Sequence, residues 1–549
     1  MTLPTLSLPT LERGLFYLLL AANLIPLWSV HYFVTGDGPC HLYNAKVLLD
    51  FYHGGDLKDF YNPWLFVNGH FEPNWFGHVF MELLLGWGTP AYLAEKFLQT
   101  FYVLSFGLGL RFLVRQVNPN ALFISTFGLL LTYHHVFQMG FYNYSCSLAI
   151  MFWVSGFWLK YRHQWTVTRM LLQAVGFLAL YFCHPIGLVF SFLVIGSVLL
   201  VELAIGLARR DRSTEQSPWE TFRSGALSVT LSAMPVIILF AEYVFVKGLN
   251  PSPRSESALQ IWEELQRFTA LSILMTTEKN WAICVAVFFA LLLGLALLFK
   301  IRSRQWRWTD VFLPVFGIAL LIYLKQPGGI AGAGILPIRL QLLPYLMLLI
   351  WLGSIDFPKW LQAGTMAFTV VVFVGLMRIR LPHHRMASNA AIEYASCGTV
   401  IPDRVSVLPI SFNHNGLDPI SGREVADHIW LYMHSGDYIG AEKSIVMLAN
   451  YEAATQNFPL IWRWERNPYD RLKKDNASFE DQPPAVDIVN YPKNSNNGTV
   501  DYVVTWCLDQ RKFGEHPRVL DIEEQLRKEY ELIFTSPHGL AKVFKRIAR

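Results

Sequence analysis

Long apolar runs separated by short polar loops fill the first two thirds of the sequence. The first run covers residues 14–34, and ten more follow before residue 378. A helix of about 20 apolar residues is long enough to cross the hydrocarbon core of a bilayer. The pattern therefore predicts a polytopic α-helical membrane protein with about eleven transmembrane helices. The later runs cover residues 91–114, 121–139, 142–159, 170–183, 186–207, 226–246, 281–300, 311–324, 338–353 and 361–377.

Lysine and arginine are unevenly distributed over the loops between these runs. If the N-terminus is cytoplasmic, Arg13 and five later basic loops lie inside, whereas the short connections at 133–144 and 184–185 carry no lysine or arginine. Basic residues favour the cytoplasmic side of a membrane. We therefore expect an integral protein of a bacterial inner membrane, with residues 35–90 and the C-terminus outside.

The composition changes after residue 377. Residues 1–377 are expected to form the transmembrane domain, and residues 378–549 resemble a soluble α/β domain outside the membrane. Strands are predicted at 405–410, 444–450, 502–508, 530–535 and 542–545, and helices at 423–431 and 522–529. Cys397 and Cys507 in this domain could form a disulfide in an oxidising compartment.

The first outside loop, residues 35–90, has two parts. Residues 40–52 read as an amphipathic helix lying along the membrane surface, and residues 60–87 as an aromatic loop that returns to the headgroup zone. Two further outside loops are expected. One carries a helix at 257–269, and the other is a glycine-rich stretch that begins at Lys325.

Asp37 stands directly after the first apolar run and before Gly38-Pro39. Such an acid is a good helix N-cap, and this could be its only role. An aspartate that faces water at a membrane surface could instead act as a general base. His41 lies one helical turn later, where it could orient Asp37 or contact a phosphate. We predict Asp37 and His41 as the catalytic pair.

Histidines gather near the predicted outer ends of the helices. Interfacial histidines are unremarkable in themselves, but several could converge on one outer cavity. With Asp37 and Glu72 they could hold a divalent cation, although their spacing matches no metal motif and we assign no metal ligands. The eight histidines are His31, His41, His53, His70, His78, His134, His135 and His184.

Arg339 opens an apolar helix just after the glycine-rich stretch. It could snorkel to lipid headgroups, but a guanidinium at this depth usually has a partner and fits phosphate oxygens well. Lys325 is a weaker candidate for the same role. The residues predicted to bind substrate are Glu72, His134, His135, His184, Lys325 and Arg339.

The order of a single N-terminal helix, a large outside loop opening with an acid, and about ten further crossings resembles the GT-C superfamily of membrane glycosyltransferases. The segment Gly36-Asp-Gly-Pro-Cys-His-Leu-Tyr43 is similar to the opening of its branch of 6-pyruvoyl-tetrahydropterin-synthase-related membrane proteins, a name that implies no pterin chemistry here. Phe137-Gln-Met-Gly-Phe-Tyr-Asn143 and Cys183-His-Pro-Ile-Gly187 resemble the outer turns of that branch.

This resemblance implies transfer of a sugar from a polyprenyl-phosphate donor to a hydroxyl of a glycan, lipid or protein acceptor in cell-envelope glycan biosynthesis. Asp37 would take the proton of the hydroxyl, and Arg339 would stabilise the departing phosphate. Many relatives carry two adjacent acids, whereas Gly38 follows Asp37 here, which weakens the case for a metal-dependent mechanism.

Other functions remain open from the sequence. A flippase for a lipid-linked precursor would show charges in mid-helix and internal repeats. A non-catalytic assembly protein would use its C-terminal domain to bind a partner, and a polysaccharide polymerase or ligase would share the lipid-linked substrate. Nucleic-acid binding is not expected, because the 45 basic residues do not gather on one soluble element.

Overall fold

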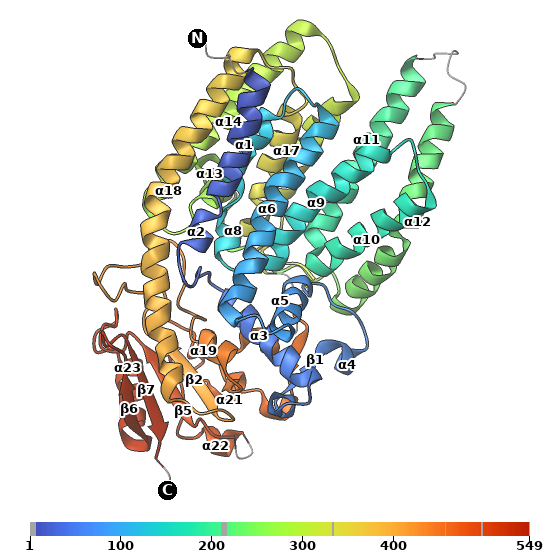
Figure 1. Cartoon of the computed structure of the whole chain (residues 1–549). Helices are drawn as coiled ribbons and strands as arrows, with labels where there is room; N and C mark the ends of the chain where they lie inside the picture. Colours follow the sequence, from blue (N-terminus) through green and yellow to red (C-terminus); the bar gives the residue numbers. More distant parts are fainter. Residues whose placement is uncertain (1–6, 210–216, 332–333, 456, 496–497, 548–549) are drawn as a thin grey trace.

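A computed structural model describes residues 7–209, 217–331, 334–455, 457–495 and 498–547. The chain forms a long helical bundle with a smaller α/β region at one end (Figure 1). The N-terminus lies near the opposite end of the bundle from this region. The protein is a polytopic helical membrane protein with a C-terminal α/β region, as the apolar pattern predicted.

Seven helical segments in the described residues are long and apolar enough to span a membrane. Three shorter apolar helical segments lie among them, and α9 (Tyr142–Tyr161) is a further long helix of the bundle. The seven are Leu8–Trp28 with α1 (Leu8–Ala22) and α2 (Ile25–Trp28), Ala91–Val117 (α6), Pro185–Ala208 in α11 (Pro185–Arg209), Pro218–Lys247 (α12), Thr276–Ser303 with α14 (Lys279–Ser303), Trp308–Lys325 with α15 (Phe312–Lys325), and Lys359–Val400 with α18 (Lys359–Ala395). The shorter ones are α5 (Phe76–Gly86), α10 (Val167–Cys183) and α16–α17 (Leu336–Leu340 and Leu342–Leu352).

The predicted crossing at residues 121–139 is not a continuous helix. Residues 121–139 form α7 (Phe123–Gly128), a 3₁₀ turn and α8 (His135–Gln138). Nearly all of these residues are buried inside the bundle. Irregular backbone is tolerated at membrane depth where protein rather than lipid surrounds it. Apolar composition cannot distinguish this buried broken segment from a lipid-facing helix.

The first outside loop is more structured and more deeply buried than expected. It contains α3 (Gly38–Tyr52), strand β1 (Tyr61–Pro63), α4 (Trp64–Asn68) and α5. Most of α3 is buried, including the polar side chains of His41 and Asn44. Helix α3 is therefore covered on both faces rather than exposed on one, because the C-terminal region covers its polar face as well.

The C-terminal region contains a five-stranded mixed sheet in the order β3-β2-β5-β7-β6. The first three strands run parallel, and β7 is antiparallel to both β5 and β6. Every predicted strand is present, and the last predicted helix is α23 (Pro517–Glu529). The strands are β2 (Ser406–Ser411), β3 (Val446–Met447), β5 (Tyr502–Trp506), β6 (Tyr530–Thr535) and β7 (Ala541–Arg546).

One predicted helix of this region is absent from the described residues. Residues 423–431 form bends rather than a helix, with hydrogen bonds to the 274 and 413–418 segments instead of an internal ladder. Cys397 and Cys507 are buried and free. The helix expected at 257–269 is present as α13 (Ala258–Arg267).

Two connections hold the C-terminal region against the bundle. Helix α18 continues past residue 377 without a break and reaches the sheet (Figure 1). Strand β1 of the first outside loop pairs antiparallel with β4 (Leu460–Trp462). Residues from opposite ends of the chain are thereby fixed beside each other.

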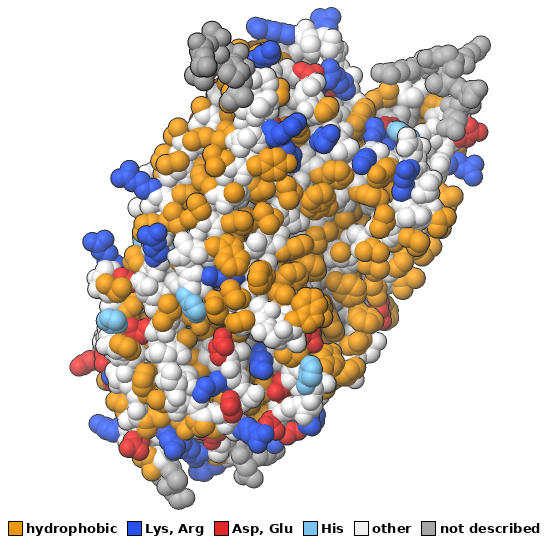
Figure 2. Space-filling model, viewed as in Figure 1, with side chains coloured by type: hydrophobic (Ala, Val, Ile, Leu, Met, Phe, Trp, Pro, Cys, Tyr) orange, Lys and Arg blue, Asp and Glu red, His pale blue; other side chains and the backbone are white. Residues whose placement is uncertain are grey.

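The molecular surface follows the same division. Hydrophobic side chains cover the middle of the helical part, whereas Lys, Arg, Asp and Glu are denser over the C-terminal end (Figure 2). The opposite end carries several Lys and Arg side chains. This distribution suits a protein whose middle section contacts lipid tails and whose two ends contact headgroups and water.

We predict that Arg380→Ala destabilises the protein by about 3–5 kcal/mol, because it leaves a buried carboxylate without a counter-ion. Arg380 Nε lies 2.8 Å from Glu278 Oε2, and Nη2 donates to the carbonyl oxygen of Leu271. Thermal unfolding of the purified protein measures the loss, with exposed Arg378→Ala as control. An equal effect of the two substitutions would contradict the importance of this ion pair.

Candidate functional site

A cavity of about 830 Å³ lies between the first outside loop, the bundle and the C-terminal region. The bundle contributes the beginnings of α11 and α16 and the ends of α12 and α15. The start of α11 and the end of α12 lie toward the end of the bundle that carries the C-terminal region (Figure 1), and residues of that region line the same cavity. The cavity is therefore placed at one end of the membrane part.

The chemical character of the lining differs between its elements. Helices α11, α12 and α15 supply apolar side chains, among them Val189, Phe190, Phe240, Val244 and Ile322. The first loop, α16 and the C-terminal region supply Asp37, Glu72, Arg339, His434, Tyr451 and Glu480. A ligand with both a long apolar part and a charged or hydroxylated part matches this lining.

A tight backbone contact fixes the position of Asp37. Its N–H donates to the carbonyl oxygen of Met139 at 2.8 Å, and the N–H of Gly36 donates to that of Gln138 at 3.0 Å. Gly140 adopts a φ of +91°, and a Cβ there would lie 2.6 Å from the Asp37 nitrogen. Only glycine allows the 139–140 turn to approach so closely.

The Asp37 carboxylate remains free for other chemistry. Asp37 occupies the N-cap position of α3, but its side chain makes no capping hydrogen bond. The side chain is 21% exposed, and its Oδ1 lies 3.9 Å from Nε2 of His434. Burial raises the pKa of Asp37 to about 6, although His41, Tyr451 and Arg339 partly oppose the shift. Such a group is ionised at neutral pH and basic enough to accept a proton.

Arg339 presents an incompletely satisfied guanidinium to the same cavity. Its Nη1 lies 3.0 Å from Nε2 of His184, and its Cζ is 4.6 Å from the centre of the Phe141 ring. Its Nε is buried without a hydrogen-bond partner among the described residues. A half-buried cation whose hydrogen-bond and ring contacts are to neutral groups favours an anionic ligand.

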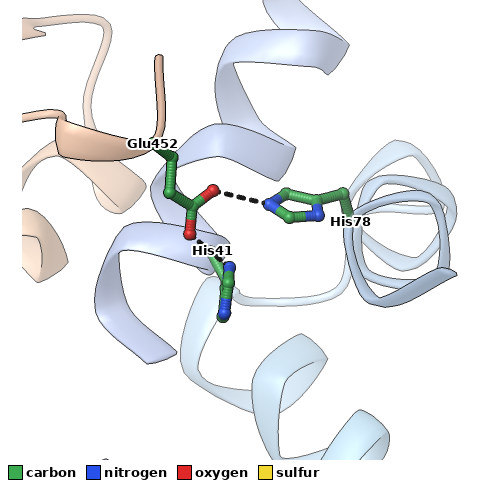
Figure 3. A group of neighbouring side chains, drawn as sticks. All are labelled: His41, His78 and Glu452. Carbon is green, nitrogen blue, oxygen red and sulfur yellow. Dashed lines mark hydrogen bonds and ion pairs between the residues drawn. The ribbon is translucent and has the colours of Figure 1, made fainter. Parts of the chain in front are cut away.

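Behind Asp37, the carboxylate of Glu452 bridges two histidines (Figure 3). His41 Nδ1 contacts Oε1, and His78 Nε2 lies 2.8 Å from Oε2. Burial alone would raise the pKa of Glu452, but the two histidines more than offset this and hold it well below its usual value. Glu452 belongs to α20 (Tyr451–Thr455), His41 to α3 and His78 to α5. The contact therefore joins three elements that are distant in the sequence.

The structure brings six of the eight predicted site residues to the cavity wall. They are Asp37, His41, Glu72, His184, Lys325 and Arg339. Glu72 is already neutralised there, since its Oε1 lies 3.0 Å from His70 Nε2 and 3.5 Å from Lys247 Nζ. Because it is already paired, Glu72 contributes to the cavity wall and is not available as a free carboxylate for a ligand.

His134 and His135 are not part of the cavity lining. His134 caps α8, where its Nδ1 accepts from the N–H of Phe137 at 3.2 Å. His135 contacts the carbonyl oxygen of Ser272 and packs on the ring of His428. Both face the protein interior because residues 121–139 bend within the bundle, and the sequence spacing could not indicate this.

Several polar residues of the site were not predicted from the sequence, among them four in the C-terminal region. His434, Tyr451, Glu452 and Glu480 all come from the C-terminal region, more than 390 residues after Asp37. Their sequence surroundings match no motif. The only available signal is the presence of a sizeable polar domain on the expected outer side of the membrane, which does not identify individual residues.

Comparison with known proteins gives a distant likeness in structure and no match in sequence. The chain matches no family model and no curated protein sequence. Among solved structures, it is similar to the oligosaccharyltransferase of Archaeoglobus fulgidus crystallised with zinc and sulfate. The TM-score is 0.42 at 10% identity, and the match covers 97% of this chain and 73% of that one.

We predict that Asp37→Asn stabilises the protein at pH 8 by about 1–3 kcal/mol, because ionising a carboxyl with a raised pKa disfavours the folded state. The gain is fully present above the folded pKa of about 6 and disappears as the pH falls toward the unfolded value of 3.8. Thermal unfolding midpoints between pH 4 and 8 measure it. Asp59→Asn in the same loop is the control, and a pH-independent difference would refute the raised pKa.

Proposed function

We propose that this protein is a glycosyltransferase that moves a sugar from a polyprenyl-phosphate donor to an acceptor hydroxyl at the outer face of the membrane. The observation that carries the proposal is one cavity whose wall holds a basic carboxylate, an unsatisfied guanidinium and an apolar surface. A lipid-linked sugar phosphate has a part that suits each of these features. The resemblance of the first loop to GT-C enzymes agrees with the same reaction.

Arg339 is assigned to the donor phosphate. Its direct contacts, His184 and Phe141, carry no negative charge, so phosphate oxygens would give the guanidinium hydrogen-bonded anionic partners. The polyprenyl chain would lie against α11, α12 and α15, whose cavity-facing side chains are apolar. Lys325 at the end of α15 also lines the cavity and is a second, more exposed cation for the phosphate.

Asp37 is assigned as the general base. It takes the proton of the acceptor hydroxyl as the oxygen forms a bond to the anomeric carbon of the sugar. The bond between that carbon and the phosphate oxygen breaks, and the phosphate leaves with the electron pair and with inversion at carbon. Arg339 stabilises the charge that develops on the phosphate, an electrostatic contribution that grows in the transition state.

The C-terminal region is assigned to the acceptor. His434, Tyr451 and Glu480 line the cavity on the side of Asp37, and burial raises the pKa of Glu480 to about 7. Hydroxyl, imidazole and carboxyl groups of this kind suit the polar edge of a glycan. A flippase, by contrast, would place its binding site near the bilayer midplane and would leave the sugar–phosphate bond intact.

We predict that Asp37→Asn lowers kcat for sugar transfer by about 10²–10⁴-fold, because the amide cannot accept the proton. The parent kcat/KM should fall as the pH drops through about 6, the value to which burial raises the pKa of Asp37. Release of polyprenyl phosphate from a panel of polyprenyl-phosphate sugars, measured with purified protein in vesicles, tests both.

Asp59→Asn is the matched control and should transfer sugar at the parent rate. Transfer by Asp37→Asn at the parent rate would refute the assignment of the base. Movement of the donor across the vesicle membrane without release of polyprenyl phosphate would favour the flippase instead.

Arg339→Gln is expected to weaken binding of polyprenyl phosphate by about 10- to 100-fold, because a hydrogen-bonded charge is lost. Acceptor KM should change little. Direct binding of polyprenyl phosphate and steady-state kinetics separate the two effects, and Lys325→Gln should have a smaller effect than Arg339→Gln because the side chain is more exposed. Equal weakening of donor and acceptor would argue against the phosphate contact.

A further inference from the structure

The cluster of His41, His78 and Glu452 has the composition of a metal site. One potential ligand atom from each residue lies within 4.8 Å of the others. His41 is 4% exposed, and His78 and Glu452 are fully buried. In Figure 3 both imidazole rings direct a nitrogen at the same carboxylate. Two imidazoles and one carboxylate form a common ligand set for zinc.

The hydrogen bonds of His78 show that something positive must lie beside Glu452. His78 Nδ1 is 3.2 Å from the carbonyl oxygen of Asn74, which can only accept, so Nδ1 carries a hydrogen. In the neutral ring, Nε2 then has a lone pair, and it faces Glu452 Oε2 at 2.8 Å. Two acceptors at this distance repel each other unless a proton or a metal ion lies between them.

We propose that His41 Nδ1, His78 Nε2 and the Glu452 carboxylate bind one zinc ion. Zinc ligands lie about 2.0–2.2 Å from the metal, and a small opening of the present cluster provides this spacing. The contact from His78 Nδ1 to a backbone carbonyl is the outer contact that metal-bound histidines usually make. Asn44 Nδ2 donates to Glu452 Oε2 at 2.6 Å and orients the carboxylate in the same way.

The proposed ion would hold the site together. Its ligands come from α3, α5 and α20, so the ion would fasten the C-terminal region to the first outside loop. His41 also lines the cavity that contains Asp37, and Tyr451 beside Glu452 interacts with the Asp37 carboxylate. The ion therefore has a positioning role behind the base. The proposal does not depend on the glycosyltransferase reaction, because metal binding is measured without turnover.

The test is the metal content of the full-length protein, purified in detergent without a polyhistidine tag and dialysed against free zinc buffered near about 1 nM. Mass spectrometry should find about one zinc per chain in the parent. His78→Gln and Glu452→Gln should lose the zinc, and Asn44→Ala should bind it at least about 10-fold more weakly. Cobalt bound in place of zinc should give the visible absorption bands of a cobalt ion with a low coordination number.

Exposed His53→Gln is the matched control and should keep the zinc of the parent. Chelation should lower the thermal unfolding midpoint of the parent and of this control, but not that of His78→Gln. Parent protein without stoichiometric zinc, or zinc retained by both His78→Gln and Glu452→Gln, would overturn the proposal. A parent that binds zinc but transfers no sugar would leave the zinc site standing and reject the enzymatic function.

Discussion

The arrangement of the site depends on how the negative charge of one buried carboxylate, that of Glu452, is balanced by its neighbours. A carboxylate shielded from water is stable only with charged or hydrogen-bonding partners around it. Glu452 finds them in His41, His78 and Asn44, all from the first outside loop. The loop in turn needs the C-terminal region, because the buried side chains of His41, His78 and Asn44 find an acceptor or a counter-charge in Glu452. Each part therefore fixes the other.

The same burial gives the neighbouring Asp37 its chemical character. The 139–140 turn places its backbone, and the C-terminal region removes most of the water around its side chain. The pKa of this carboxyl rises to about 6 for that reason. A carboxylate whose ionised form is destabilised by burial is a better proton acceptor than an exposed aspartate. The same burial lowers the free energy of unfolding at neutral pH, so stability is reduced where the base is placed.

Arg339 and Glu72 of the cavity wall do not pair with each other. Arg339 is held by His184 and Phe141, whereas Glu72 is paired with His70 and Lys247. A guanidinium that forms no close ion pair with a carboxylate in the described part of the chain retains its attraction for a ligand anion. Combined with the apolar ends of α11, α12 and α15, this separation makes the cavity suited to an amphiphile with an anionic head.

The sequence by itself determined the membrane class, most of the helical segments and the five C-terminal strands. The length of an apolar run shows whether it can span a bilayer, and its period distinguishes strands from helices. It also identified Asp37, His184 and Arg339 as site residues. Each is a polar residue at the end of an apolar run, which is where a membrane helix meets the water-exposed loops. Only the tertiary structure decided that His134 and His135 turn inward and that His434, Tyr451 and Glu452 join the site. Those positions depend on how α3, α5 and α20 pack, and packing between segments about 400 residues apart leaves no periodic trace in the sequence.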